Sequence, residues 1–284
     1  MPGATGEDLE VLLEVAVRAA ERGAEVLRSY YGEGRSGPAG DLRVEEKARN
    51  DYVSRADRES EEVIIETILD AFPSHRLLAE ESGAKPSAKS DFEWIIDPLD
   101  GTTNFLRGVP YFCVSIACLF SGKGTVGVVL DPLREDFFTS MAGRGAQRNG
   151  ESLHIESDVG LAGAFLATGF PFKAHPALES YLGIFRDAFL EARGIRRCGA
   201  AALDLAYTAA GVYDGFFEFC LSPWDLAAGC LLIEEAGGVV SDLDGGDSYL
   251  ERGSVLAGPA TLHREMLEVV GRHTSEKRLA ECLR

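Results

Sequence analysis

The chain has 284 residues, of which 45% are hydrophobic and 26% are charged, as in an ordinary globular protein with a buried core. Its 28 Lys and Arg residues against 46 Asp and Glu residues give a formal net charge of −18. This charge repels nucleic acids and anionic membranes at long range, so we expect neither as a partner. The first ten residues are acidic where a signal peptide is basic, and the six cysteines contain no C-x-x-C pair. Both features predict a cytoplasmic protein.

The first half of the chain predicts two helices followed by strands. Apolar residues recur at helical spacing over 7–30, and a second helix is expected to begin near Asp57, a favoured N-cap residue, and to stop before Pro73. Short β-branched and aromatic runs then predict strands at 94–96, 113–120, 126–130 and 136–140, with a tight turn at 148–151.

After about residue 150 the predicted strands and helices alternate, which is typical of an α/β architecture. The sequence therefore predicts two tightly packed parts, an α+β half at 1–150 and an α/β half at 151–284. In the second half we expect strands at 165–167, 195–198, 215–219, 239–241 and 254–256, and helices at 176–192, 201–211, 224–236 and 259–272.

Three segments place acidic residues beside large apolar side chains: residues 77–82 (LLAEES), 94–105 (WIIDPLDGTTNF) and 223–228 (PWDLAA). In the second segment an apolar strand leads to Asp97, and Asp100 is expected to point back toward the same place. Crowded, partly buried carboxylates must be neutralised by protons, basic partners or metal ions. None of the three segments contains Lys or Arg. Carboxylate oxygens without His or Cys favour Mg²⁺ over Zn²⁺.

The residues after Asp100 suit an anion, because Gly101 permits close approach of the main chain and Thr102 and Thr103 supply hydroxyls. Metal ions and N–H donors at one place favour the hydrolysis of a phosphate ester, a small-molecule substrate. Each motif alone has a plainer interpretation: a solvated turn at 80–81, an Asp-Pro turn at 97–101, and an N-cap at Asp225. Their joint occurrence favours the metal site.

The motif WIIDPLDGTTNF, with Glu80-Glu81-Ser82 before it and Trp224-Asp225 after it, resembles the inositol monophosphatase family of lithium-sensitive, Mg²⁺-dependent sugar phosphatases. The resemblance extends from residue 47 to about residue 256. It implies a layered α-β-α-β-α sandwich, a homodimer, and two or three bound Mg²⁺ ions.

The same resemblance assigns roles residue by residue. Glu80, Asp97 and the Leu99 carbonyl would hold one metal ion, Asp97, Asp100 and Asp225 a second, and Glu80 with waters a third. Gly101 and Thr102 match the phosphate-binding and water-orienting positions, and Asp57 matches the acid that pairs with Thr102. The implied catalytic set is thus Thr102, Asp57, Glu80 and Asp97, and the implied contacts to inositol hydroxyls are Gly199, Ala201 and Glu218.

The expected activity is Mg²⁺-dependent hydrolysis of inositol 1-phosphate or a related polyol or sugar phosphate. Fructose 1,6-bisphosphate, histidinol phosphate and 3′-phosphoadenosine phosphate stay open as substrates of the same chemistry. From the residue pattern alone, Glu218 is equally well an outward-facing residue of an edge strand. An alternative of another class is a catalytically idle member that serves in interaction or regulation.

Overall fold

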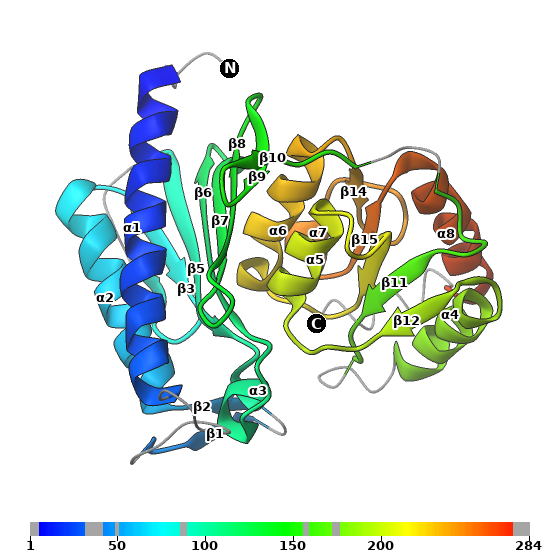
Figure 1. The fold of residues 1–284 in the computed structure, drawn as a ribbon, viewed down its shortest axis with the longest axis horizontal. Coiled ribbons are helices and arrows are strands. Elements are labelled where there is room, and N and C mark those ends of the chain that lie inside the picture. Colours follow the sequence, from blue (N-terminus) through cyan, green and yellow to red (C-terminus); the bar gives the residue numbers. More distant parts are fainter. Residues whose placement is uncertain are drawn as a thin grey trace.

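Two sheets alternate with three pairs of helices in the computed structural model, which describes residues 6–31, 42–48, 51–85, 90–155, 159–171 and 177–274 (Figure 1). The predicted layered α-β-α-β-α sandwich is therefore confirmed. From one outer face to the other, the helical layers are α1 (Gly6–Tyr31) with α2 (Arg55–Ala71), α5 (Ala201–Ala209) with α6 (Pro223–Glu235), and α4 (Leu178–Glu191) with α8 (Ala260–His273).

The first sheet has eight strands and is antiparallel except where β3 pairs with β5. That parallel pair aligns Ala79 with Ile96, so the residues that follow, Glu80 and Asp97, come to one edge of the sheet. In spatial order the strands are β10 (Glu151–Ser152), β9 (Gly145–Arg148), β8 (Asp136–Met141), β7 (Lys123–Asp131), β6 (Cys113–Phe120), β5 (Phe92–Asp100), β3 (Arg76–Ala79) and β4 (Gly83–Lys85).

The second sheet has five strands and mixes parallel with antiparallel pairs. Glu218 ends its central strand and is 9% exposed, so the edge-strand interpretation of this residue is wrong. The spatial order is β12 (Gly194–Arg196), β11 (Phe165–Thr168), β13 (Gly215–Glu218), β15 (Val255–Gly258) and β14 (Val239–Ser241).

Several short elements were not expected from the sequence. A hairpin of β1 (Glu45–Ala48) and β2 (Asp51–Val53) precedes α2. The short helix α3 (Thr102–Arg107) follows β5 at the place where the sequence was expected to suit an anion. A further turn of helix, α7 (Tyr249–Arg252), precedes β15. Strand β5 also continues beyond Ile96 to Asp100, with an irregular register between Asp97 and Asp100. The irregularity lets both aspartates of one strand serve one site.

Helices α5 and α6 contact both sheets, so the two predicted halves share a helical layer. The first sheet ends at Ser152 and the second begins at Phe165. The division near residue 150 stays a prediction about domains. Among the described residues, no helix combines the length and the apolar character needed to cross a bilayer.

Candidate metal and phosphate site

Three carboxylates from two parts of the chain meet between the first sheet and α6. One oxygen each of Asp97, Asp100 and Asp225 lies within 4.8 Å of the others. Asp97 is 1% exposed and Asp100 is 8% exposed. The main chain holds each side chain in place: Leu99 N donates to Asp97 Oδ1 at 3.0 Å, and Ala202 N donates to Asp100 Oδ2 at 2.7 Å. Two of the three acidic segments, 94–105 and 223–228, therefore meet in this cluster, and the charge of Glu80 from the third acts on Asp97 and Asp100.

Two of the predicted site residues are fixed by the same local motif, a capping box at the start of a helix. Asp57 accepts the Ser54 N–H at 2.9 Å, and Asp225 accepts the Ser222 N–H at 2.7 Å. Each aspartate thus stands three residues after its N-cap serine, in the first turn of α2 or α6. The expectation that Asp57 is itself the N-cap is wrong, as is the plainer interpretation of Asp225 as an N-cap.

Glu80 lies near the three aspartates but is held by a base from a distant element. Lys47 Nζ, on β1, lies 3.0 Å from Glu80 Oε1 and 2.8 Å from Glu81 Oε1. Burial lowers the pKa of Lys47, but the two carboxylates outweigh burial and raise the pKa overall. Glu61 in turn accepts the N–H groups of residues 81 and 82 at 2.8 and 2.9 Å, which fixes this turn.

The hydroxyl of Thr102 lies between two acceptors. Its Oγ1 is 3.0 Å from Asp57 Oδ1 and 3.1 Å from the Leu99 carbonyl oxygen, and its single proton serves one of them at a time. Gly101 precedes it with φ +93°, a left-handed conformation that glycine adopts without strain. An added Cβ at Gly101 would lie 3.0 Å from the Tyr111 carbonyl oxygen, so both the turn and its close packing require glycine.

Burial and mutual repulsion make these carboxylates hard to ionise. Burial, with the charges of Glu80, Asp100 and Asp225, raises the pKa of Asp97 well above its usual value. Burial raises the pKa of Asp100 to about 7 and that of Asp57 to about 6, although hydrogen bonds from the main chain and from hydroxyls act in the opposite direction. In the described part of the chain, neither Asp97 nor Asp100 forms an ion pair. The cluster therefore requires protons or cations.

Glu218 approaches the site from the second sheet. Burial, with the nearby charges of Asp204 and Asp225, raises its pKa well above the usual value, and Arg197 acts in the opposite direction. Its carboxylate occupies the space beside Gly169, where an added Cβ would lie 1.8 Å from Glu218 Oε1. Gly199 and Ala201 flank the start of α5, whose residue Ala202 binds Asp100.

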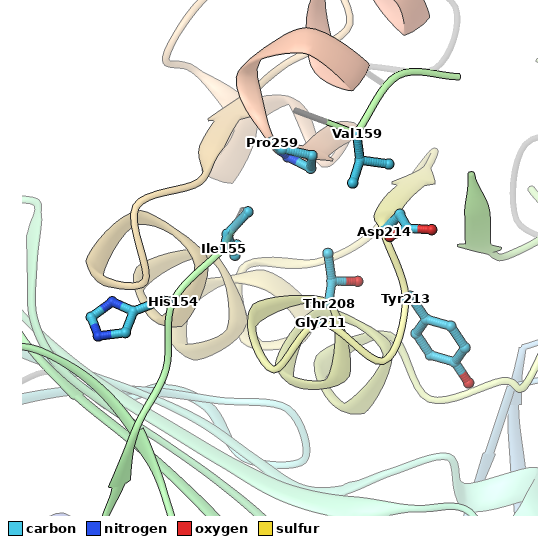
Figure 2. Close-up of a pocket in the computed structure, with 8 residues that line it drawn as sticks. All are labelled: His154, Ile155, Val159, Thr208, Gly211, Tyr213, Asp214 and Pro259. Atoms are coloured by element: carbon cyan, nitrogen blue, oxygen red, sulfur yellow. The ribbon is translucent and has the colours of Figure 1, made fainter. Parts of the chain in front are cut away.

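A separate hollow lies away from these carboxylates. It has a volume of about 240 Å³, and Figure 2 shows the linker residues Ile155 and Val159 and the nearby Pro259 around one side of it, with the turn between α5 and β13 on the other. None of its eight lining residues belongs to the predicted site. They are His154, Ile155, Val159, Thr208, Gly211, Tyr213, Asp214 and Pro259.

Lys47, Glu61 and Asn104 take part in the site, but their roles were not identified from the sequence. Lys47 and Glu61 reach the site only through tertiary contacts, and no local spacing connects either of them to residues 80–82. Asn104 stands within the recognised motif, yet two of the carbonyl groups that it approaches lie more than ninety residues away, at 198–199. Ser54 and Ser222 had a readable signal, since a serine three residues before an aspartate is typical of a capping box.

Comparisons with known proteins show which sequences and folds this chain resembles. The model of the inositol monophosphatase family matches residues 8–277. Nus factor SuhB of Pseudomonas aeruginosa is 44% identical over 270 residues, covering 93% of this chain and 97% of that protein. The crystal structure of extragenic suppressor protein suhB from Bartonella henselae superposes with a TM-score of 0.87 at 39% identity, covering 93% of this chain and all of that one. Inositol monophosphatase from Anabaena superposes with a TM-score of 0.82 at 34% identity, covering 95% and 99%.

One expectation from composition is overturned by these comparisons. A net charge of −18 led us to exclude nucleic acid as a partner, but relatives that share nearly half of their residues with this chain are named Nus factors, a name from transcription. Net charge governs long-range attraction to a bare polyanion. It does not govern binding to an assembly in which proteins provide the contact surface, so the exclusion does not follow.

Proposed function

The chain belongs to the inositol monophosphatase family, and from this premise we propose that it is a Mg²⁺-dependent phosphomonoesterase acting on inositol 1-phosphate or a related polyol phosphate. The observation that carries the proposal is the convergence of Asp97, Asp100 and Asp225 within 4.8 Å, beside the Thr102–Asp57 hydrogen bond. Fructose 1,6-bisphosphate, histidinol phosphate and 3′-phosphoadenosine phosphate are further candidates for the same chemistry.

The donor set fits a hard divalent cation. All of the side-chain ligand atoms are carboxylate oxygens, and burial keeps water from solvating the charges of Asp97 and Asp100. In the proposal Asp97, Asp100 and Asp225 hold Mg²⁺, with Glu80 and the Leu99 carbonyl completing two or three sites. When bound, the ions would polarise the phosphoryl group and make water more acidic.

The chain's own residues would then bind the phosphate and move a proton. Gly101 turns the main chain so that the uncapped first turn of α3 faces the phosphate. Thr102 holds the attacking water through its hydroxyl, because that hydroxyl can donate to Asp57 and accept from water at the same time. Asp57, whose pKa burial raises to about 6, takes the proton that the hydroxyl relays.

A direct test is phosphate release from inositol 1-phosphate, measured with Mg²⁺ and after removal of metal with EDTA. We expect turnover only with the metal, and a higher kcat/KM for this ester than for fructose 1,6-bisphosphate, histidinol phosphate and 3′-phosphoadenosine phosphate. Absence of phosphate release from every ester at saturating Mg²⁺ would leave the chain a catalytically idle member of its family.

Glu218 is expected to select the substrate rather than to drive hydrolysis. Glu218→Gln keeps the shape of the side chain and removes the carboxylate that Glu218 forms when it is ionised, so a hydroxyl-bearing substrate loses an acceptor that binds strongly. The expected result is an increase of about tenfold in KM for inositol 1-phosphate, with kcat within about threefold of wild type. Steady-state kinetics on inositol 1-phosphate and 4-nitrophenyl phosphate measure this, and an equal loss on both substrates would contradict the role.

The names of the relatives favour a second role. Several proteins that are 44–45% identical to this chain are named Nus factor SuhB, and we propose that this chain also acts in transcription. Binding of the purified chain to RNA polymerase, measured for the wild type and for Asp97→Asn, tests this role. We expect both proteins to bind, because the variant changes a buried residue; absence of binding by both would overturn the second role.

A further inference from the structure

The resemblance to inositol monophosphatases implies that Gly199 and Ala201, in the segment 198–201 that leads into α5, contact the polyol part of the substrate. Glycine has no side chain and alanine has only a methyl group, so these residues can offer a hydroxyl group only main-chain N–H and C=O. Gly199 also has φ +92°, a conformation that other residues adopt with strain. The direction of the main chain at this segment therefore sets what it can recognise.

One side chain of the metal and phosphate motif holds this segment. Asn104, on α3, donates from Nδ2 to the Cys198 carbonyl oxygen at 2.9 Å, with the Gly199 carbonyl oxygen at 3.4 Å. The same amide donates to the Tyr111 carbonyl oxygen at 2.8 Å. An added Cβ at Gly199 would lie 2.5 Å from Arg197 Nη1 and 3.3 Å from Asn104 Nδ2, so both side chains pack against this residue.

The segment and the residue that follows it, Ala202, are thus tied to the motif at two points. Asn104 binds it at 198–199, and Asp100 accepts the Ala202 N–H at 2.7 Å. Asp100 also belongs to the carboxylate cluster, whereas Asn104 is uncharged and is bonded to main-chain carbonyls from two segments. Asn104 stands two residues after Thr102, on the same helical turn. A movement of its carboxamide would therefore change the spacing between the segment 198–201 and residues 101–102, the proposed phosphate-binding turn (the phosphate turn).

We propose that Asn104 is a positioning residue that sets substrate preference: its carboxamide fixes the main chain at 198–199 at one distance from the phosphate turn. The inference rests on the proposed phosphatase function. It assigns to Asn104 no contact with the substrate and no part in proton transfer. A substrate with ring hydroxyls would depend on this spacing, and a substrate held by its phosphate alone would not.

The test uses two variants of Asn104 and one control. Asn104→Ala removes the donor, and Asn104→Asp keeps the shape but turns an acceptor toward carbonyl oxygens that are themselves acceptors. The control, Tyr207→Phe, removes the hydrogen bond from the Tyr207 hydroxyl to Asp136 Oδ2 at 3.0 Å. That bond joins α5 to strand β8 of the first sheet, so the control shows what a general loosening of α5 against this sheet does to the kinetics.

For Asn104→Ala we expect KM for inositol 1-phosphate to rise about tenfold, with kcat within about threefold and KM for 4-nitrophenyl phosphate within about twofold of wild type. Asn104→Asp is expected to raise the first KM further. Amide hydrogen exchange over 197–203 should become faster in both variants and stay unchanged in Tyr207→Phe.

Three results would overturn the inference: an equal rise of KM for both substrates, the same kinetic change in Tyr207→Phe, or unchanged hydrogen exchange over 197–203 in both Asn104 variants. The exchange measurement does not need turnover. A wild-type protein that hydrolyses no ester therefore refutes the proposed function, while the exchange rates still decide whether Asn104 holds the segment.

Discussion

Replacing Asp97 with asparagine is expected to abolish phosphatase turnover, lowering kcat/KM for inositol 1-phosphate by about a thousandfold or more. Asp97 is fully buried within the carboxylate cluster, and the family resemblance implies that it would contribute to two of the metal sites. A neutral amide is a poor bridge between two cations, and losing several kcal/mol of stabilisation at the transition state corresponds to this factor. Steady-state assays across a range of Mg²⁺ concentrations measure the loss, and titration calorimetry shows whether Mg²⁺ still binds.

The same substitution should leave the fold intact or make it more stable without metal. The introduced amide would carry no charge among Glu80, Asp100 and Asp225, and its oxygen can still accept the Leu99 N–H. A matched control is Asp242→Asn, since Asp242 is also buried but accepts the N–H groups of 244 and 246 in a turn of the second half. The control is expected to keep full turnover. Near-normal activity of Asp97→Asn would contradict the assignment of this site.

The layers of the fold follow from local patterns, which explains why most long elements were predicted. The helix α1 and the strand β8 have the apolar periodicity that a buried face requires, and β6 and β7 are continuous runs of mainly apolar residues, typical of strands buried on both faces. The short elements were missed because tertiary contacts stabilise them. The hairpin β1–β2 is a charged sequence, EEKA and DYV, whose Lys47 is held by Glu80 and Glu81 more than thirty residues away.

The residues of the site likewise divide into those that local sequence patterns bring together and those that only the whole fold brings together. Asp97 and Asp100 could be placed together because one strand and one turn connect them. Asp225 was included only because three acidic segments occur together, since nothing in its own segment distinguishes a metal ligand from a residue in the first turn of a helix. Asn104 illustrates the limit best: its position in the motif was evident, but the Cys198 carbonyl that it binds is ninety-four residues away. Long-range partners are set by the fold as a whole.

Without metal, the melting temperature is expected to fall as the pH rises from 6.5 to 8.5. Burial raises the pKa of Asp100 and of Asp204 to about 7, and that of Asp97 and Glu218 well above the usual value. The folded protein therefore binds protons in this range that the unfolded chain, with carboxyl pKa values near 4, has already released. Because the folded state binds more protons, its stability falls as pH rises through the folded-state pKa values. We expect a decrease of about 5 °C or more.

Magnesium should reverse this trend, because divalent ions take the place of the protons. The stabilisation by a ligand grows with its concentration relative to its dissociation constant, and protons compete with Mg²⁺ less at pH 8.5 than at pH 6.5. Differential scanning fluorimetry at both pH values measures this effect. After treatment with EDTA, the protein receives either about 10 mM Mg²⁺, which fills a site of millimolar affinity, or NaCl at the same ionic strength, which controls for general screening. The increase in melting temperature with Mg²⁺ is expected to be larger at pH 8.5, and Asp97→Asn should show a smaller increase at both. A melting temperature that is constant or rising with pH in the absence of metal, or a Mg²⁺ effect that is the same in the variant, would show that these buried carboxylates do not form a cation site.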